Sequence, residues 1–434
     1  MSRIDALPGM RDYYPEEMRV RRWIEDRWRE TALRFGFEEY DAPVLEPLEL
    51  YTRKSGEEIV GQLYTFEDKG GRQVALRPEM TPSLARMIAA RSQGLPKPIK
   101  WFSIPRLFRY ERPQRGRFRE FWQLNLDILG VEGIEADAEI MAAGVEVLRA
   151  CGLGSEEFIV RYSDRRLLDA VMDRFGVPAD RREAAYAGLD KLLKGGPDAA
   201  QAALVKAGFE TGVSERLVRA VARRDLAGLE EELGWKTSAP PPELEPLKRL
   251  AEYLDAYGVG EFCEFDAGIV RGLAYYTGVV FEMYDRAGEL RALCGGGRFD
   301  DLLGAAGGED LPAVGFGLGE AVLLELLQKR GLTPTQKLDC EVSVVPLSAA
   351  DRTEAIQITT RLRREGFRVD LWLQEQSLNR ALKRAEQAKP RFVIVHSSVE
   401  RAAGLVAVRD QATGERDRIN RKDLVNWLKY RRHD

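Results

Sequence analysis

The chain has 434 residues, of which 44% are hydrophobic, and this size predicts roughly two to four domains with cores of their own. No run of about 18 apolar residues occurs, which excludes a membrane-spanning helix, and the first residues lack the pattern of a secretion signal, so we expect a soluble, cytoplasmic protein. The net charge of −4 is uneven: residues 336–434 hold 20 Lys and Arg against 14 Asp and Glu, and this basic C-terminal part hints at contact with nucleic acid.

The rarer residue types exclude some chemistry. The four cysteines are scattered without CxxC pairs, which predicts neither disulfides nor a metal site built from a protein motif. Only two histidines occur, of which His433 is next to the last residue and His396 ends an apolar strand-like run. We therefore do not expect acid–base catalysis by histidine.

The first part of the chain alternates helices and strands. Residues 16–36 predict an amphipathic helix, and residues 81–91 predict a second one with Thr81-Pro82 as its cap and first turn. Residues 37–45 predict a strand whose Pro43 indicates an edge or an interface. Further strands are predicted at residues 63–66, 74–76, 100–108 and 121–129, and a helix at 135–151.

The later segments change character twice. Residues 164–257 are charged and rich in Ala and Leu, which indicates a helical insertion. Strand patterns return at residues 261–270, 276–284 and 290–294, before an apolar run at 313–328 and a linker at 330–336. Beyond it, strands at 340–346, 368–372, 391–396 and 404–409 alternate with helices at 349–365, 377–387 and 421–430, which predicts a separate α/β module.

Six arginines lie between positions 106 and 119, on one predicted hairpin with Glu111 among them. Such a cluster favours a polyanion, and phosphate is the natural ligand because guanidinium binds it bidentately and never loses its charge. Gln123 and Asp127 lie at even spacing on the return strand, so both side chains project from one face. A solvated hairpin is the alternative, but an ordered amide and carboxylate beside the cations favour a site.

Two other segments carry candidate residues. Glu79 and Thr81 lie at a strand-to-helix junction, where Thr81 either caps the helix or helps Glu79 to receive a ligand ammonium group. Arg271, Tyr275 and Tyr276 interrupt an apolar stretch, either as a surface arginine beside core tyrosines or as part of a site.

No loop of the chain has the pattern of a known phosphate-binding loop. A Walker loop is absent, and Gly315-Phe-Gly-Leu-Gly319 does not match GxGxxG, so we interpret its glycines as close packing. Any phosphate would therefore be held by arginine side chains.

In combination these segments resemble a known family. Residues 108–111 with the arginine turn resemble motif 2 of class II aminoacyl-tRNA synthetases, and residues 36–43 resemble motif 1, whose proline marks a dimer interface. Residues 76–79 (Leu-Arg-Pro-Glu), 111–119 (Glu-Arg-Pro-Gln-Arg-Gly-Arg-Phe-Arg) and 271–276 (Arg-Gly-Leu-Ala-Tyr-Tyr) are similar to histidyl-tRNA synthetases. The similarity covers nearly the whole chain and is weakest at 164–257.

The resemblance implies an α+β fold, in which an antiparallel class II synthetase sheet is flanked by helices. It divides the chain into a first catalytic part (residues 1–163), a helical insertion (164–257), a second catalytic part (258–329), a linker (330–336) and a C-terminal α/β anticodon-binding domain (337–434).

The implied reaction is ATP-dependent ligation of L-histidine to its tRNA through histidyl-adenylate. ATP is then a substrate that brings Mg²⁺, tRNA(His) is a partner, and the assembly is a homodimer. The alternative is a non-catalytic paralogue, which binds histidine as the regulatory subunit of ATP phosphoribosyltransferase and typically lacks the anticodon module.

The resemblance also implies roles for single residues. Arg109 and Arg271 would be the catalytic arginines at the α-phosphate, with Glu111 at the adenine and Arg117 at the outer phosphates. The histidine site would comprise Glu79, Thr81 and Gln123 at the ammonium group, Arg271 at the carboxylate, Asp127 with Tyr275 or Tyr276 at the imidazole, and Met80. Gln114 is a candidate for contact with the tRNA acceptor end, because a side-chain amide can bond a base edge.

Several positions depart from the family pattern. Asp127 replaces the usual Glu, Trp122 a common His, Met80 a common Gly and Ala274 the usual Asp. Val322 lies where motif 3 has an arginine on the ATP γ-phosphate. We hypothesise that Arg115, Arg117 or Arg298 supplies the missing charge.

Overall fold

The computed structural model describes residues 4–52, 60–91, 94–112, 114–235, 240–269, 276–301, 304, 308, 310–334, 340–374, 380, 383 and 390–432. Contacts divide the chain into two compact units, Met1–Pro334 and Thr335–Asp434. This division falls inside the predicted linker, whereas the finer boundaries within the first unit stay predictions. None of the helices in these described ranges is long and apolar enough to cross a membrane.

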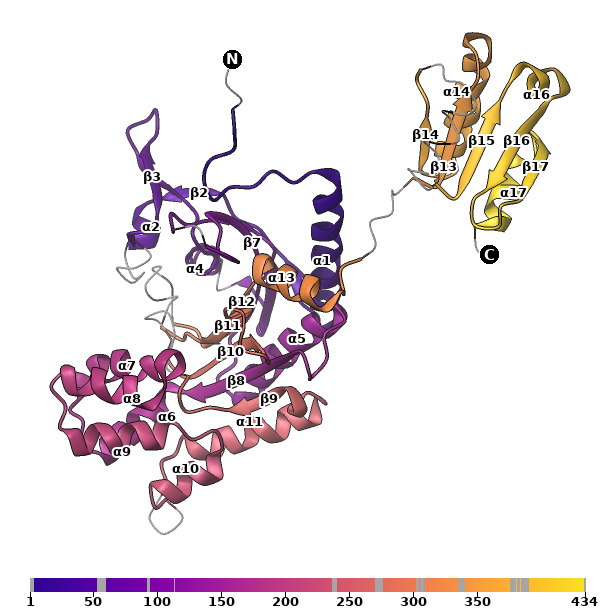
Figure 1. The fold of residues 1–434 in the computed structure, drawn as a ribbon. Coiled ribbons are helices and arrows are strands. Elements are labelled where there is room, and N and C mark those ends of the chain that lie inside the picture. The colour runs from indigo at the N-terminus through magenta and orange to yellow at the C-terminus, as the bar shows by residue number, and fades with distance from the viewer. Residues whose placement is uncertain are drawn as a thin grey trace. The chain divides into compact units, whose positions relative to one another are not determined.

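In the described part of the first unit, nine strands form one largely antiparallel sheet (Figure 1). Its antiparallel centre runs in the order β5 (Ile99–Ser103), β7 (Glu120–Leu129), β12 (Ala313–Gly319), β11 (Cys294–Arg298), β10 (Val279–Asp285) and β8 (Phe158–Asp164). At the edges, β1 (Glu38–Glu39) pairs with β5 and β9 (Cys263–Phe265) pairs with β8, both in parallel. The short strand β6 (Arg106–Phe108) pairs with the first residues of β7 and so builds the arginine hairpin.

Residue alternation along β7 separates the core from the opposite face of the sheet. Leu124, Leu126 and Ile128 join the main hydrophobic core together with α5 (Ile134–Ala150), which packs on β7 and β12. The helices α1 (Pro15–Arg34) and α11 (Leu244–Ala256) cover α5 from outside, which explains why α5 is buried along most of its length. The intervening residues of β7 are therefore left for the other face.

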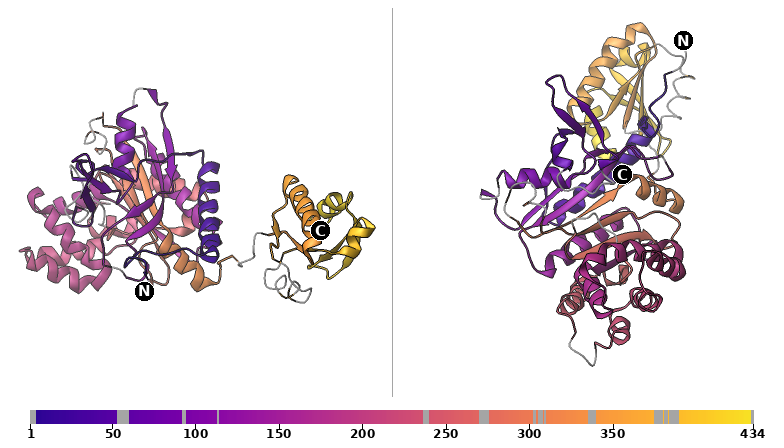
Figure 2. Two further views of the ribbon diagram at one scale, coloured as in Figure 1. Left: turned by 90° about the horizontal axis from the view of Figure 1, so that it is seen from above. Right: turned by 90° about the vertical axis from the view of Figure 1, so that its left-hand side faces the viewer.

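Smaller elements surround this sheet. The strands β2 (Leu45–Pro47), β4 (Gln73–Leu76) and β3 (Tyr64–Glu67) form an antiparallel sheet beside α2 (Glu49–Thr52) and α4 (Thr81–Ala89). The predicted helical region contains α6 (Arg165–Arg174), α7 (Arg182–Leu189), α8 (Lys191–Lys206), α9 (Thr211–Val221), α10 (Leu226–Glu232) and α11. Figures 1 and 2 show α6 to α10 gathered as a cluster near β8, so the helical character predicted for this segment is confirmed.

Several predicted strands differ from the structure for local reasons. Pro105 separates β5 from β6, so the single strand predicted at 100–108 is wrong, and the strand predicted at 37–45 is interrupted around Pro43. The strand predicted at 290–294 is displaced, because the glycine run that follows is itself strand β11. The apolar run at 313–328 is the strand β12 followed directly by helix α13 (Glu320–Arg330).

The second unit has its own five-stranded sheet in the part that the structure describes. The order is β14 (Val369–Leu371), β13 (Val342–Pro346), β15 (Phe392–His396), β16 (Leu405–Asp410) and β17 (Arg416–Asn420). The helices α14 (Arg352–Arg364), α16 (Ser398–Ala403) and α17 (Leu424–Arg431) complete the unit, and a separate core holds it together. The α/β module is thus confirmed, although β17 was not predicted. The helix predicted at 377–387 lies outside the described residues except at positions 380 and 383.

Candidate active site

A small cavity of about 70 Å³ opens on the polar face of β7. Six predicted site residues line it: Glu79, Thr81, Arg109, Gln123, Asp127 and Tyr276. The even spacing on β7 therefore did place Gln123 and Asp127 on one face, as predicted. Arg271 and Tyr275 lie outside the described residues.

Met80 and Thr81 occupy different surroundings from each other. Met80 is only 1% exposed and does not line the cavity, because it takes the N-cap position of α4 with its side chain in the core. Thr81 is the first residue of α4 and no side-chain hydrogen bond caps this helix, so the predicted capping role of Thr81 is wrong. Its side chain is available to the cavity instead.

Glycines of β12 make the cavity possible. A Cβ atom at Gly315 would overlap the carboxylate of Asp127, and one at Gly317 would overlap the side-chain amide of Gln123. Both side chains thus lie across a strand that has no side chains of its own at these positions. Gly315 and Gly317 are thus explained by close packing, here between a strand and the side chains of its neighbour.

Asp127 is the most unusual titratable group of the cavity. Its side chain is 5% exposed, and burial raises the pKa of its carboxyl to about 8. No cation among the described residues offsets this burial. Burial likewise raises the pKa of the Tyr276 hydroxyl, which therefore stays protonated. The Asp127 carboxyl is thus a buried acceptor that a hydrogen-bond donor or a cation of a ligand would stabilise.

A larger cleft of about 210 Å³ adjoins the cavity. The two share Arg109 and Gln123 as lining residues, and the predicted ATP residues Glu111 and Arg117 also line the cleft. The Arg109 Nε donates a hydrogen bond of 3.0 Å to the Pro78 carbonyl oxygen, which fixes the arginine hairpin to the segment before α4. Glu111 and Arg117 form an ion pair.

The tip of the hairpin is divided: Gly116 and Arg117 line the cleft, whereas Gln114 and Arg115 line neither the cavity nor the cleft. Gln114 and Arg117 form a β-bridge around Gly116, and Gln114 lines neither cavity. Arg115 forms an ion pair of 2.6 Å, Nε to Oε1, with Glu325 of α13. Val322 does line the cleft, and a Cβ atom at Gly116 would lie 3.3 Å from its Cγ2.

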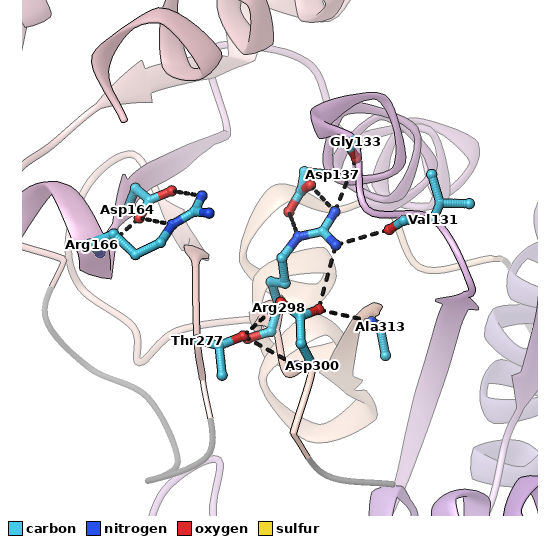
Figure 3. A network of polar contacts seen from close by, with 9 residues as sticks. All are labelled: Val131, Gly133, Asp137, Asp164, Arg166, Thr277, Arg298, Asp300 and Ala313. Carbon is cyan, nitrogen blue, oxygen red and sulfur yellow. Dashed lines mark hydrogen bonds and ion pairs between the residues drawn. The ribbon is translucent and has the colours of Figure 1, made fainter. Parts of the chain in front are cut away.

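Arg298 is buried between the sheet and α5 and lines neither the cavity nor the cleft. The residue is 3% exposed, and its guanidinium pairs with Asp137 and donates hydrogen bonds of 2.9 Å and 3.0 Å to the carbonyl oxygens of Val131 and Gly133 at the start of α5 (Figure 3). The hypothesis that Arg298 replaces the motif 3 arginine is therefore wrong. A buried arginine with these partners secures β11 to α5.

Sequence reasoning missed one polar residue of the cavity, Asn125, and one charged residue of the cleft, Arg291. Asn125 lies between Gln123 and Asp127 on β7 and lines the cavity with them, so its even spacing was an available signal. Arg291 lines the cleft from the loop between β10 and β11, and no motif pointed to it.

An antiparallel sheet whose arginine hairpin borders a buried polar cavity defines the catalytic domain of a class II aminoacyl-tRNA synthetase. Residues 9–322 match the family model of histidyl-tRNA synthetase, and residues 341–431 match that of an anticodon-binding domain. The chain belongs to the histidyl-tRNA synthetase family.

Similar proteins span the whole length of the chain. A histidine–tRNA ligase of Opitutus terrae is 42% identical over 429 residues, which cover 98% of both chains. A histidine–tRNA ligase of Pyrococcus horikoshii is 38% identical over 436 residues, covering 98% of this chain and 99% of that one.

Solved structures show the same fold. The histidyl-tRNA synthetase of Nostoc sp. PCC 7120 superposes with a TM-score of 0.84 at 24% identity, covering 99% of this chain and 100% of that chain. A protein of Bacillus halodurans described as an ATP phosphoribosyltransferase regulatory subunit/histidyl-tRNA synthetase has a TM-score of 0.75 at 25% identity, covering 91% and 98%.

Proposed function

We propose that the protein ligates L-histidine to tRNA(His) in an ATP-dependent reaction with a histidyl-adenylate intermediate. The observation that carries this proposal is the buried carboxyl of Asp127 in a polar cavity that adjoins an arginine-lined cleft, in a member of the histidyl-tRNA synthetase family. The full-length similarity to histidine–tRNA ligases and the second unit favour the catalytic enzyme over the regulatory paralogue.

The cavity suits histidine as a ligand. Asp127 and the Tyr276 hydroxyl provide partners for the two ring nitrogens of an imidazole, one of which is an N–H donor. Glu79, Thr81 and Gln123 would then receive the ammonium group, and of these three Gln123 also lines the cleft. By resemblance, Arg271 and Tyr275 join this set.

The first step places the carboxylate of histidine beside the α-phosphate of ATP. A carboxylate oxygen attacks the α-phosphorus, the bond to the β-phosphate oxygen breaks, and pyrophosphate leaves. Negative charge grows on the phosphate oxygens, which the fixed guanidinium of Arg109 stabilises, so no general base is required. Arg109 lines both cavities and is therefore placed where the two substrates would meet.

The other ligands follow from the same resemblance. Mg²⁺ would arrive with ATP and be held mainly by its phosphates, as is usual for this ion.

In the second step a ribose hydroxyl of the tRNA attacks the acyl carbon and AMP leaves. Gln114 at the exposed hairpin tip would contact the acceptor end, and the second unit would bind the anticodon. A cytoplasmic homodimer remains the expected assembly, and elution at the monomer mass would contradict it.

Amino-acid-dependent exchange between ATP and pyrophosphate tests the proposal. We expect exchange with histidine alone among the amino acids, and transfer of labelled histidine to tRNA(His). Arg109→Ala should abolish both while leaving the fold intact. Binding of histidine without any exchange would instead support the regulatory alternative.

A further inference from the structure

We propose that Arg291 binds the outer phosphates of ATP and takes the place of the arginine that the family pattern has at position 322. The inference rests on the proposed function, because it assigns a role within the same cleft. Arg291 lies in the loop that joins β10 to β11, on the wall of the cleft formed by Leu293, Ala321 and Val322.

The backbone around Arg291 is held in place from several directions. On its N-terminal side, the Leu290 amide donates to the buried carboxylate of Asp285 at 2.8 Å. On its C-terminal side, Leu293 donates to the Met283 carbonyl oxygen at 2.8 Å and accepts a 3.2 Å hydrogen bond from the amide of Gly319. The loop is thereby fixed to both β10 and the start of α13, and Arg291 is kept at the rim of the cleft.

The other candidate cations are already engaged. Arg298 is buried against Asp137, Arg115 is paired with Glu325 and lines neither cavity, and Arg117 is paired with Glu111. Within the described part of the chain, the guanidinium of Arg291 has no hydrogen-bond or ion-pair partner, although its side chain lines the cleft. An exposed arginine in that situation is free to bind an anion.

Its position indicates which phosphates it would contact. Arg109 lines both cavities and so belongs near the α-phosphate, where histidine reacts. Arg291 lines only the cleft, beside the first turn of α13, so it faces the part of the ligand that extends away from the histidine cavity.

Charge balance supports the same role. Besides Arg109, the cleft holds the Arg117–Glu111 pair, whose charges largely cancel. The wall at Ala321 and Val322 is apolar and offers no cation to a triphosphate. The guanidinium of Arg291, from the neighbouring loop between β10 and β11, supplies this charge in a bidentate geometry.

Steady-state exchange kinetics test the proposal. In Arg291→Ala we expect the KM for ATP to rise about tenfold or more, as for the loss of one charge-assisted hydrogen bond, while the KM for histidine changes little. Arg291→Lys should have a KM for ATP between those of wild type and Arg291→Ala, because lysine keeps the positive charge but cannot form the bidentate hydrogen bonds of a guanidinium. Arg330→Ala, which removes an exposed cation at the far end of α13, is the matched control and should behave as wild type.

Moving the charge provides a second measurement. Adding Val322→Arg to Arg291→Ala should restore much of the ATP affinity, which a merely structural role for Arg291 would not allow. An unchanged KM for ATP in Arg291→Ala, with exchange intact, would overturn the inference and leave the proposed function standing. Absence of histidine-dependent exchange in the wild-type protein would instead overturn the proposed function.

Discussion

The burial of the Asp127 carboxyl indicates which kind of ligand the cavity binds. The Asp127 carboxyl packs against Gly315 of β12, and no cation among the described residues offsets its burial. Burial therefore raises its pKa to about 8. An isolated carboxylate in such a place is costly, and an imidazole N–H would offset that cost. The burial that weakens the empty protein thus favours a histidine-like ligand.

This pKa has a consequence for stability. Between pH 4 and pH 8 the folded protein keeps a proton on Asp127 that the unfolded chain releases, so stability falls as the pH rises. We expect the free energy of unfolding of wild type to fall over this window relative to that of Asp127→Asn, by up to about 1.4 kcal/mol per pH unit. Saturating histidine should reduce the slope. Parallel pH profiles for the two proteins, measured by calorimetry, would contradict this account.

At the same scale, the sequence predicted most but not all of the cavity. Spacing on β7 was sufficient for Gln123 and Asp127, because a strand has a fixed period of two. Met80 could not be excluded, since a residue beside a site is equally able to turn into the core. Arg291 had no signal, because loop geometry alone brings it to the cleft.

Among the elements, β12 contributes to the cavity mainly by leaving room for side chains of β7. Gly315, Gly317 and Gly319 alternate along it, and the first two leave room for side chains of β7. The strand therefore sets the depth of the cavity through residues that bear no functional group.

Substitutions along β12 should separate binding from folding. In Gly317→Ala the new Cβ meets mainly the flexible end of Gln123, so we expect the KM for histidine to rise about tenfold or more with a small loss of stability. In Gly315→Ala the Cβ also meets the Leu126 carbonyl oxygen at 2.7 Å, so stability should fall as well. Gly319→Ala is the control, because no atom lies within 4 Å of its Cβ position. Equal kinetics in all three variants would refute this role of β12.

Long elements were predicted more successfully than short ones. The helices at 16–36 and 135–151 have strong patterns and correspond to α1 and α5. The strand β11 was displaced in the prediction because glycine favours turns in general, whereas here close packing against neighbouring strands requires it. Prolines at 43 and 105 divided strands whose hydrophobic patterns ran on.

The molecule as a whole consists of two units with separate cores. Both cavities of the candidate site are lined only by residues of the first unit. The candidate adenylation site therefore lies in the first unit, whereas the match to an anticodon-binding domain lies in the second.

A fragment that contains only the first unit should activate histidine but charge tRNA(His) poorly. Residues 1–334 alone should keep histidine-dependent exchange, since both cavities are intact. Charging of tRNA(His) by this fragment should fall about tenfold or more, because contacts of the second unit with the anticodon are lost. Charging rates equal to those of the full chain, measured under the same salt conditions, would exclude the second unit from tRNA recognition.

The polar face of β7 has a further consequence for redesign. Three adjustable side chains, Gln123, Asn125 and Asp127, stand on this one strand, while the facing positions of β12 are glycines. Part of the histidine site that we propose thus lies at alternate positions of a single ten-residue segment, Glu120–Leu129. A library confined to these three codons would explore most of the polar chemistry on the sheet floor of the cavity without disturbing the hydrophobic residues between them.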